Sequence, residues 1–226
     1  LSIAFPEKHS ARAIRQKYKE LGKKFFYSQY LLLKVSDDES KFRDEWLTYY
    51  GAGTQLGYGP KKGEVRVLGI IDPSGGTTPD HDDVGILIAG IDRNPFIWMY
   101  EGIEARLTPF QLIETVIELN SIYSVDEWYM EAYAMANVYR AMIQQYINAN
   151  RVKISIRPIK GNTAPGAKVT RILGSRWLFE MRKVAVLERH KAFLKQYREW
   201  FPGNSGCKDH ILDCFGWLKE KVYPRN

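Results

Sequence analysis

Apolar and helix-like segments follow one another in an order that few folds accommodate. Two apolar runs, 65–71 and 84–90, are joined by a connector rich in Gly, Pro and Asp, which predicts an antiparallel pair of strands. The segments expected after this pair are a strand at 96–100, a helix at 108–121, a strand at 125–131, a helix at 137–150, a strand at 152–158, a helix at 169–183, a short strand at 184–187, and helices at 190–200 and 208–222. This order predicts an α/β fold with a mixed five-stranded sheet flanked by helices.

The composition is that of a folded domain rather than a disordered chain. Apolar residues make up 45% of the 226 residues and aromatic residues 13%. No apolar stretch approaches the roughly 18 residues that a membrane-spanning helix needs. The first residues also lack the long hydrophobic region of a signal peptide. We therefore expect a globular protein without a membrane partner.

The charge distribution favours a polyanionic partner. The formal net charge is +7, and the segment 151–199 carries thirteen Lys or Arg against three Glu. A solvated helix face that keeps a basic protein soluble is the ordinary alternative. A basic half beside an acidic cluster is, however, the arrangement expected of a protein that holds phosphates in one region and attacks them in another.

Three acidic residues stand at the boundaries of predicted elements. Asp72 ends the first strand and precedes the turn 73–76, Glu131 ends a later strand, and Asp209 lies at the start of the last helix. Side chains at strand ends and a helix start can converge on one edge of a sheet. Such a cluster is too repulsive to persist without cations, so it predicts a divalent metal site.

Each acid also has an ordinary structural interpretation. Asp before Pro is a common turn opener, which covers Asp72. Glu131 and Asp209 could be charges at helix entrances, where the helix dipole favours an anion. His210 could be a metal ligand or a proton carrier, although a lone His beside a helix start is more often structural.

Further acids lie close to these three in the sequence. Asp213 is one turn after Asp209, within an otherwise apolar helix, so it needs a partner or a cation if it points inward. Asp82 and Asp83 stand at the entry to the second strand, and the sequence does not distinguish which of them points inward.

Taken together, the acids fit phosphodiester hydrolysis with two metal ions. Two Mg²⁺ or Mn²⁺ ions about 3.5–4 Å apart would be bridged by Asp72. One ion would activate water and the other would stabilise the leaving 3′ oxygen. Oxygen ligands suit these cations, whereas zinc would need His or Cys at spacings that the chain does not offer.

The same residues resemble the C-terminal nuclease domain of the large terminase subunit of tailed bacteriophages, which has a ribonuclease H-like fold. The resemblance covers about 63–223, and the 25–42 segment is similar to the linker that follows the terminase motor domain. The matching motifs are Gly69-Ile70-Ile71-Asp72-Pro73, Asp82-Asp83, Met130-Glu131, Lys168-Val169-Thr170-Arg171-Ile172 and Asp209-His210-Ile211-Leu212-Asp213.

The resemblance implies roles for individual residues. Asp72, Glu131 and Asp209 would be catalytic metal ligands. Many relatives carry two adjacent acids where this chain has Lys208-Asp209-His210, so the last ligand could instead be Asp213. The predicted auxiliary ligands are Asp82, Asp83 or Asp213, and the predicted contacts with the DNA backbone are Lys160, Lys168, Arg171 and Arg176.

The resemblance also implies the setting of the protein. We expect an endonuclease that cuts concatemeric viral double-stranded DNA during genome packaging in the host cell cytoplasm. In the full-length protein the partners would be an ATPase motor domain, the portal and the small terminase subunit. Because the chain lacks a Gly-x-x-x-x-Gly-Lys-Ser/Thr loop, we expect no ATPase activity here. We expect 1–62 to be a helical linker arm after a missing motor domain, and 63–226 to be the nuclease domain.

Two alternatives remain open at this point. A Holliday-junction resolvase or a transposase-type nuclease would use the same fold and the same metals on branched DNA. A non-catalytic DNA-binding module would use the basic half to clamp duplex DNA, with the acids serving only as turn and cap residues.

Overall fold

The computed structural model describes residues 10, 42–73, 83–132, 134–150, 154–161, 164, 166–204 and 206–224. Most of the predicted linker arm, up to residue 41, lies outside the described residues. The predicted metal ligand Asp82 also lies outside them. In the part of the chain that the structure describes, no helix is long and apolar enough to cross a membrane.

A mixed sheet forms the centre of the molecule. Its strands are β1 (Thr48–Tyr49), β2 (Arg66–Asp72), β3 (Val84–Ile91), β4 (Ile97–Ala105), β5 (Glu127–Ala132), β6 (Ile156–Lys160) and β7 (Val184–Val186). They lie in the order β1-β7-β4-β3-β2-β5-β6. The neighbouring pairs β2–β3 and β3–β4 are antiparallel, and β2–β5, β5–β6, β4–β7 and β1–β7 are parallel. The predicted antiparallel pair at the start of the domain is confirmed.

The sheet has seven strands where the sequence predicts five. The difference lies at one edge, where β7 pairs with β4 and β1 pairs with β7. The sequence predicts the short strand at 184–187 that becomes β7, but not its place in the sheet, and it gives no strand at β1, which has only two residues. Because β1 belongs to the 1–62 segment, part of that segment is built into the sheet. Phe42 and Leu47, which precede β1, are buried in the same core as apolar side chains of the helices that follow β7.

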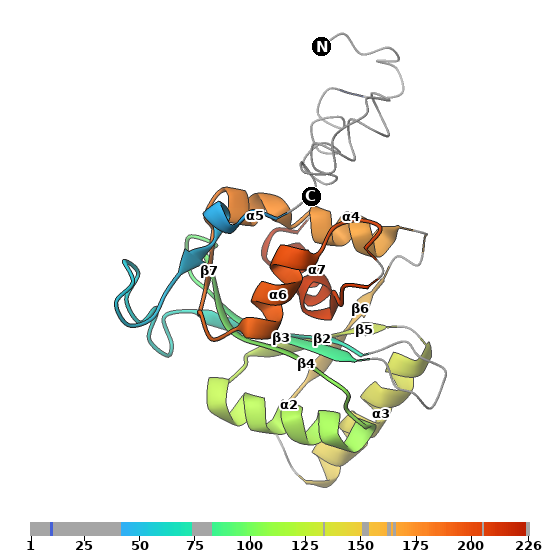
Figure 1. Ribbon diagram of the computed structural model, residues 1–226. Coiled ribbons are helices and arrows are strands. Elements are labelled where there is room, and N and C mark those ends of the chain that lie inside the picture. Colours follow the sequence, from blue (N-terminus) through green and yellow to red (C-terminus); the bar gives the residue numbers. More distant parts are fainter. Residues whose placement is uncertain are drawn as a thin grey trace.

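Helices cover both faces of the sheet (Figure 1). On one face lie α2 (Pro109–Tyr123) and α3 (Ala134–Ala149), and on the other lie α4 (Ala167–Leu173), α5 (Arg176–Glu180), α6 (Lys191–Glu199) and α7 (His210–Val222). A short 3-10 helix, η2 (Asp44–Trp46), precedes β1. Each face has its own apolar core, and the core beneath α7 is rich in aromatic side chains.

Helix boundaries follow local chemistry. Thr108 and Gln111 form a capping box at the start of α2, with Pro109 as its first residue. The prediction of one continuous helix over 169–183 is wrong, because the chain forms α4 and α5 instead. At the break, the backbone amide and the hydroxyl of Ser175 both donate to the carbonyl of Ile172, which replaces the regular helical pattern.

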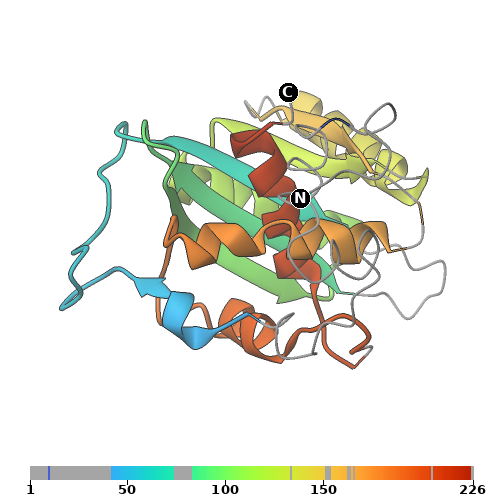
Figure 2. The ribbon, with the colours of Figure 1, turned by 90° about the horizontal axis from the view of Figure 1, so that it is seen from above.

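Helix α7 lies across the middle of the sheet, over β2 and β3 (Figure 2). Its first turn approaches the backbone of β3 closely at Gly85. A Cβ atom at this glycine would lie 2.8 Å from atoms of His210, so a larger residue would push the helix away. This close approach brings the start of α7 to the edge of the sheet where β2 and β5 end.

Candidate metal centre

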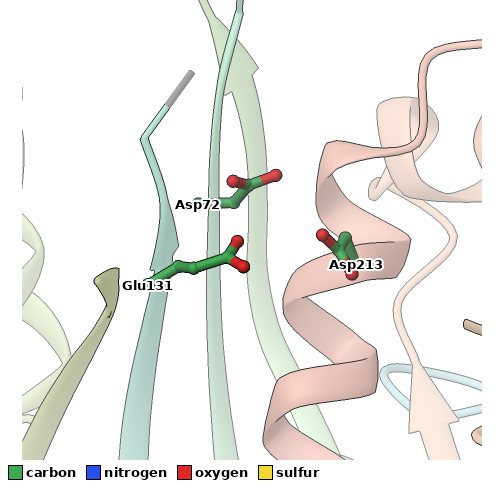
Figure 3. A group of neighbouring side chains, drawn as sticks. All are labelled: Asp72, Glu131 and Asp213. Carbon is green, nitrogen blue, oxygen red and sulfur yellow. The ribbon is translucent and has the colours of Figure 1, made fainter. Parts of the chain in front are cut away.

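Three carboxylates meet at the edge of the sheet beneath α7. Asp72 is the last residue of β2, Glu131 lies near the end of β5, and Asp213 is in the first turn of α7. Each offers one oxygen, and these oxygens all lie within 4.8 Å of one another. Figure 3 shows the three side chains pointing toward one another, two from the strands and one from the helix.

The backbone explains why these side chains meet. Strands β2 and β5 are parallel, and Ile71 pairs with Met130, so the residues that follow them, Asp72 and Glu131, end at the same edge. Asp213 is only 1% exposed and lies among the apolar residues of α7. Its position inside the core therefore requires charged partners.

Arg171 of α4 is the main partner of Asp213. The guanidinium binds the carboxylate with two hydrogen bonds, from Nε to Oδ1 at 2.6 Å and from Nη2 to Oδ2 at 2.7 Å. The same group lies 3.8 Å from the ring centre of Trp217 and 3.9 Å from Glu131 Oε1. Gly216 makes room for the Arg171 side chain, since a Cβ there would lie 2.6 Å from its Cγ.

Lys168, one turn earlier on α4, places a second positive charge at the site. Its Nζ lies 2.7 Å from Asp209 Oδ1 and 3.7 Å from one oxygen each of Asp72 and Asp213. Burial lowers the pKa of Lys168, but the carboxylates of Asp72, Asp213 and Asp209 outweigh that effect and raise its pKa above the usual value. The lysine is therefore charged throughout the physiological range.

His210, the first residue of α7, contacts the carboxylate of Asp72. Its Nδ1 lies 3.2 Å from Asp72 Oδ2. Burial lowers the pKa of His210, but the hydrogen bond and the charge of Asp72 more than offset it, so the pKa is raised. The contact links the first turn of the helix to the end of β2.

The carboxylates are held in an environment that disfavours their charge. Burial, followed by the charge of Asp72, raises the pKa of Glu131, and the guanidinium of Arg171 opposes this shift. Burial also raises the pKa of Asp213, again against the effect of Arg171. A divalent cation would relieve both effects, and a donor set made only of carboxylate oxygens suits Mg²⁺ or Mn²⁺. The residues present therefore fit the predicted metal.

The raised pKa of Glu131 leads to a prediction about stability. A folded-state pKa above the unfolded value means that ionised Glu131 costs folding free energy at neutral pH, and this cost disappears as the pH falls through the folded pKa. Glu131→Gln is therefore expected to stabilise the metal-free protein at pH 7, on the order of 1 kcal/mol. Urea denaturation in the presence of a chelator measures the change. If the variant were less stable than the wild type at pH 7, this would contradict the argument that ionised Glu131 costs folding free energy.

The remaining predicted ligands lie around the three carboxylates. Asp209 precedes α7, and its carboxylate contacts Lys168 and, at 3.3 Å, the indole nitrogen of Trp200. Of the two alternatives for the last ligand, the structure brings Asp213 into the group of three oxygens. Asp83 forms ion pairs with Lys208 and, at 3.8 Å, with Arg106. The ligand roles of Asp209 and Asp83 stay predictions.

The predicted DNA contacts occupy different environments. Lys160 is exposed at the end of β6, and Lys168 is partly exposed above the carboxylates. Arg171 is buried, so the structure gives it a role in holding Asp213 that the sequence did not reveal. Arg176 lies 3.7 Å from Glu180 and packs over the ring of Trp46. Contact of these residues with DNA stays a prediction.

Two solved structures share this fold. The human cytomegalovirus terminase nuclease domain is 13% identical, with a TM-score of 0.54, over 79% of this chain and 94% of that domain. The P22 large terminase nuclease domain is 11% identical, with a TM-score of 0.53, over 81% of this chain and 92% of that domain. Among curated proteins, none matches the chain significantly.

The helix-flanked mixed sheet, with acids at the ends of two parallel strands and on the helix that crosses them, defines a ribonuclease H-like domain. The family model described as the terminase RNaseH-like domain matches residues 69–214, well over half of the chain. The chain belongs to this terminase family. The resemblance and the fold class expected from the sequence are thereby confirmed.

Proposed function

We propose that the chain is a metal-dependent endonuclease that cuts concatemeric viral double-stranded DNA during genome packaging. The observation that carries this proposal is the convergence of Asp72, Glu131 and Asp213 within 4.8 Å at a partly buried edge of the sheet. Membership of the terminase RNaseH-like family supports it, as does the likeness to two terminase nuclease domains.

Asp72, Glu131 and Asp213 would hold two Mg²⁺ or Mn²⁺ ions, with Asp209 next to them on the exposed side. When bound, the ions supply activation of water and stabilisation of the leaving oxygen. The chain itself orients the ligands. Arg171 fixes both oxygens of Asp213, and His210 contacts Asp72.

DNA would reach this site along a positively charged edge. Lys160 is exposed at the end of β6 and pairs in the sheet with Ala132, the residue after Glu131, so its backbone lies near the edge where the carboxylates meet. Lys168 is 37% exposed at the side-chain level and lies directly above them. Both ammonium groups can contact phosphate oxygens, which position a duplex without reading its sequence.

The wider setting is part of the same proposal. In a packaging machine this domain would act with an ATPase motor, the portal and the small terminase subunit, in the cytoplasm of the host cell. The basic charge of the domain, +7 overall, suits a protein that engages the DNA backbone.

Metal-dependent nicking of supercoiled plasmid tests the function. Cleavage is expected with Mg²⁺ or Mn²⁺ and is expected to stop when EDTA is added in excess, because the bound ions would supply both the activation of water and the stabilisation of the leaving oxygen. Gel electrophoresis of the products measures it. Plasmid retained in a gel shift but uncut under either metal would instead support a non-catalytic DNA-binding module.

A substrate comparison separates the proposed packaging nuclease from a junction resolvase. Linear duplex and a four-way junction with the same arm sequences are incubated with the protein and Mn²⁺. Similar rates on the two substrates support the packaging role, whereas symmetrical cleavage confined to the junction would show a resolvase of the same fold.

A further inference from the structure

Helix α6 contributes one buried polar side chain to the start of α7. The side-chain oxygen of Gln196 accepts hydrogen bonds from the backbone amides of Ile211 at 3.0 Å and Leu212 at 3.2 Å. Gln196 is 3% exposed. These two amides belong to the second and third residues of α7, which have no partner within the helix itself.

The N-cap residue of a helix ordinarily satisfies these amides, and Asp is among the residues best suited to do so. Asp209 stands at the N-cap of α7, but its carboxylate contacts Lys168 Nζ at 2.7 Å and Trp200 Nε1 at 3.3 Å. Gln196 thus takes over the capping function from another helix. The carboxylate of Asp209 is thereby left available at the exposed side of the candidate metal centre.

We propose that Gln196 is a positioning residue for the metal centre. By binding the first turn of α7 from α6, it fixes the turn that carries His210 and Asp213, and it allows Asp209 to face Lys168. The inference rests on the proposed function in one respect: the geometry that Gln196 maintains is that of metal ligands. Supporting residues of this kind commonly change metal affinity by about 10–100-fold when they are altered.

The two ends of the Gln196 amide differ, and this difference provides matched variants. The oxygen accepts two hydrogen bonds, whereas the nitrogen Nε2 has no partner among the residues that the structure describes. Gln196→Glu keeps an accepting oxygen and places a negative charge where the helix dipole favours it. Gln196→Met keeps the length of the side chain and removes the acceptor.

The test combines Mn²⁺ affinity, measured by electron paramagnetic resonance on the whole chain, with hydrogen exchange of the Ile211 and Leu212 amides. Gln196→Met is expected to bind Mn²⁺ at least about tenfold more weakly and to lose protection at both amides. Gln196→Glu is expected to keep the protection and to bind within about threefold of the wild type or more tightly, because the hydrogen-bond acceptor is retained.

Tyr197→Phe serves as the structural control. Tyr197 is the next residue of α6, and its hydroxyl donates to the backbone carbonyl of Arg43 at 2.9 Å, away from α7. This variant loses a hydrogen bond from the same helix, so it reports what general destabilisation of α6 does. Its Mn²⁺ affinity is expected to match that of the wild type.

Three results would overturn the inference. These are unchanged Mn²⁺ affinity in Gln196→Met, equal losses in Gln196→Met and Gln196→Glu, or an equal loss in Tyr197→Phe. Failure of the proposed function looks different, because the wild type itself would then bind no Mn²⁺. In that case the amide exchange still decides whether Gln196 caps α7: protection lost with Met and kept with Glu supports the cap, and unchanged protection refutes it.

Discussion

Asp72→Asn is expected to reduce metal-dependent DNA cleavage by at least about a hundredfold. Changing a residue that only supports a metal ligand ordinarily costs less activity than this. Asp72 contributes one of the three converging oxygens and ends strand β2. Asn has the same shape, so the protein should stay folded. Its amide has no charge and only one oxygen, so it cannot bind a divalent cation as the carboxylate does. Initial rates of plasmid nicking in Mn²⁺ measure the effect.

Asp44→Asn provides the matched control. Asp44 also carries its carboxylate in an ion pair, with Arg198 at 2.9 Å, but on the exposed surface of η2. The same chemical change there should leave the nicking rate within about twofold, since surface ion pairs contribute little. If Asp72→Asn cut DNA at the wild-type rate, hydrolysis would have to take place elsewhere on the protein.

Arg171→Met is expected to destabilise the protein by about 3–5 kcal/mol. The guanidinium donates two hydrogen bonds to Asp213, which is 1% exposed, and packs on Trp217. Met fills a similar volume but leaves the carboxylate of Asp213 in the core without its principal partner. Urea denaturation in a metal-free buffer, followed by circular dichroism, measures the loss.

Two further variants test the cause of that loss. Arg198→Met removes the surface pair with Asp44 and should cost less than about 1 kcal/mol. In the double variant Arg171→Met with Asp213→Leu, both buried charges are absent, so most of the lost stability should return. A double variant as unstable as Arg171→Met alone would show that packing of the arginine, rather than the unpaired charge, accounts for the loss.

The sheet edge of the site was predictable because strong local signals mark it. The five residues before Asp72, 67–71, are continuously apolar, as expected of a strand buried on both faces, and their end coincides with an acid. Glu131 ends a similar short run. Once both runs are placed side by side in a parallel pair, the proximity of these two acids follows from the geometry of the sheet.

The helical half of the site was less predictable. Asp209 and Asp213 lie one turn apart, and only the packing of α7 on the sheet determines which of them joins the carboxylates. Nothing in the sequence distinguishes Lys168 from Arg171 as a DNA contact. In the structure, Lys168 lies at the exposed side of the site, whereas Arg171 is buried against α7. No local pattern marks Gln196, because its partners are backbone amides of a distant helix.

The added edge of the sheet was hidden for a related reason. Strand β1 has only two residues, too few for the alternation that identifies a strand, and the short strand predicted at 184–187 carries no local signal of where it joins the sheet. Their pairing depends on contacts between segments more than 130 positions apart, such as Thr48 with Ala185. A signal of that kind exists only in the folded chain.

Diffraction from crystals soaked in Mn²⁺, measured at the manganese absorption edge, tests the central claim most directly. We expect two anomalous peaks about 3.5–4 Å apart among the carboxylates of Asp72, Glu131 and Asp213. No peak at saturating Mn²⁺, with Lys168 and Arg171 still paired to the same oxygens, would contradict the assignment of this cluster as a metal centre.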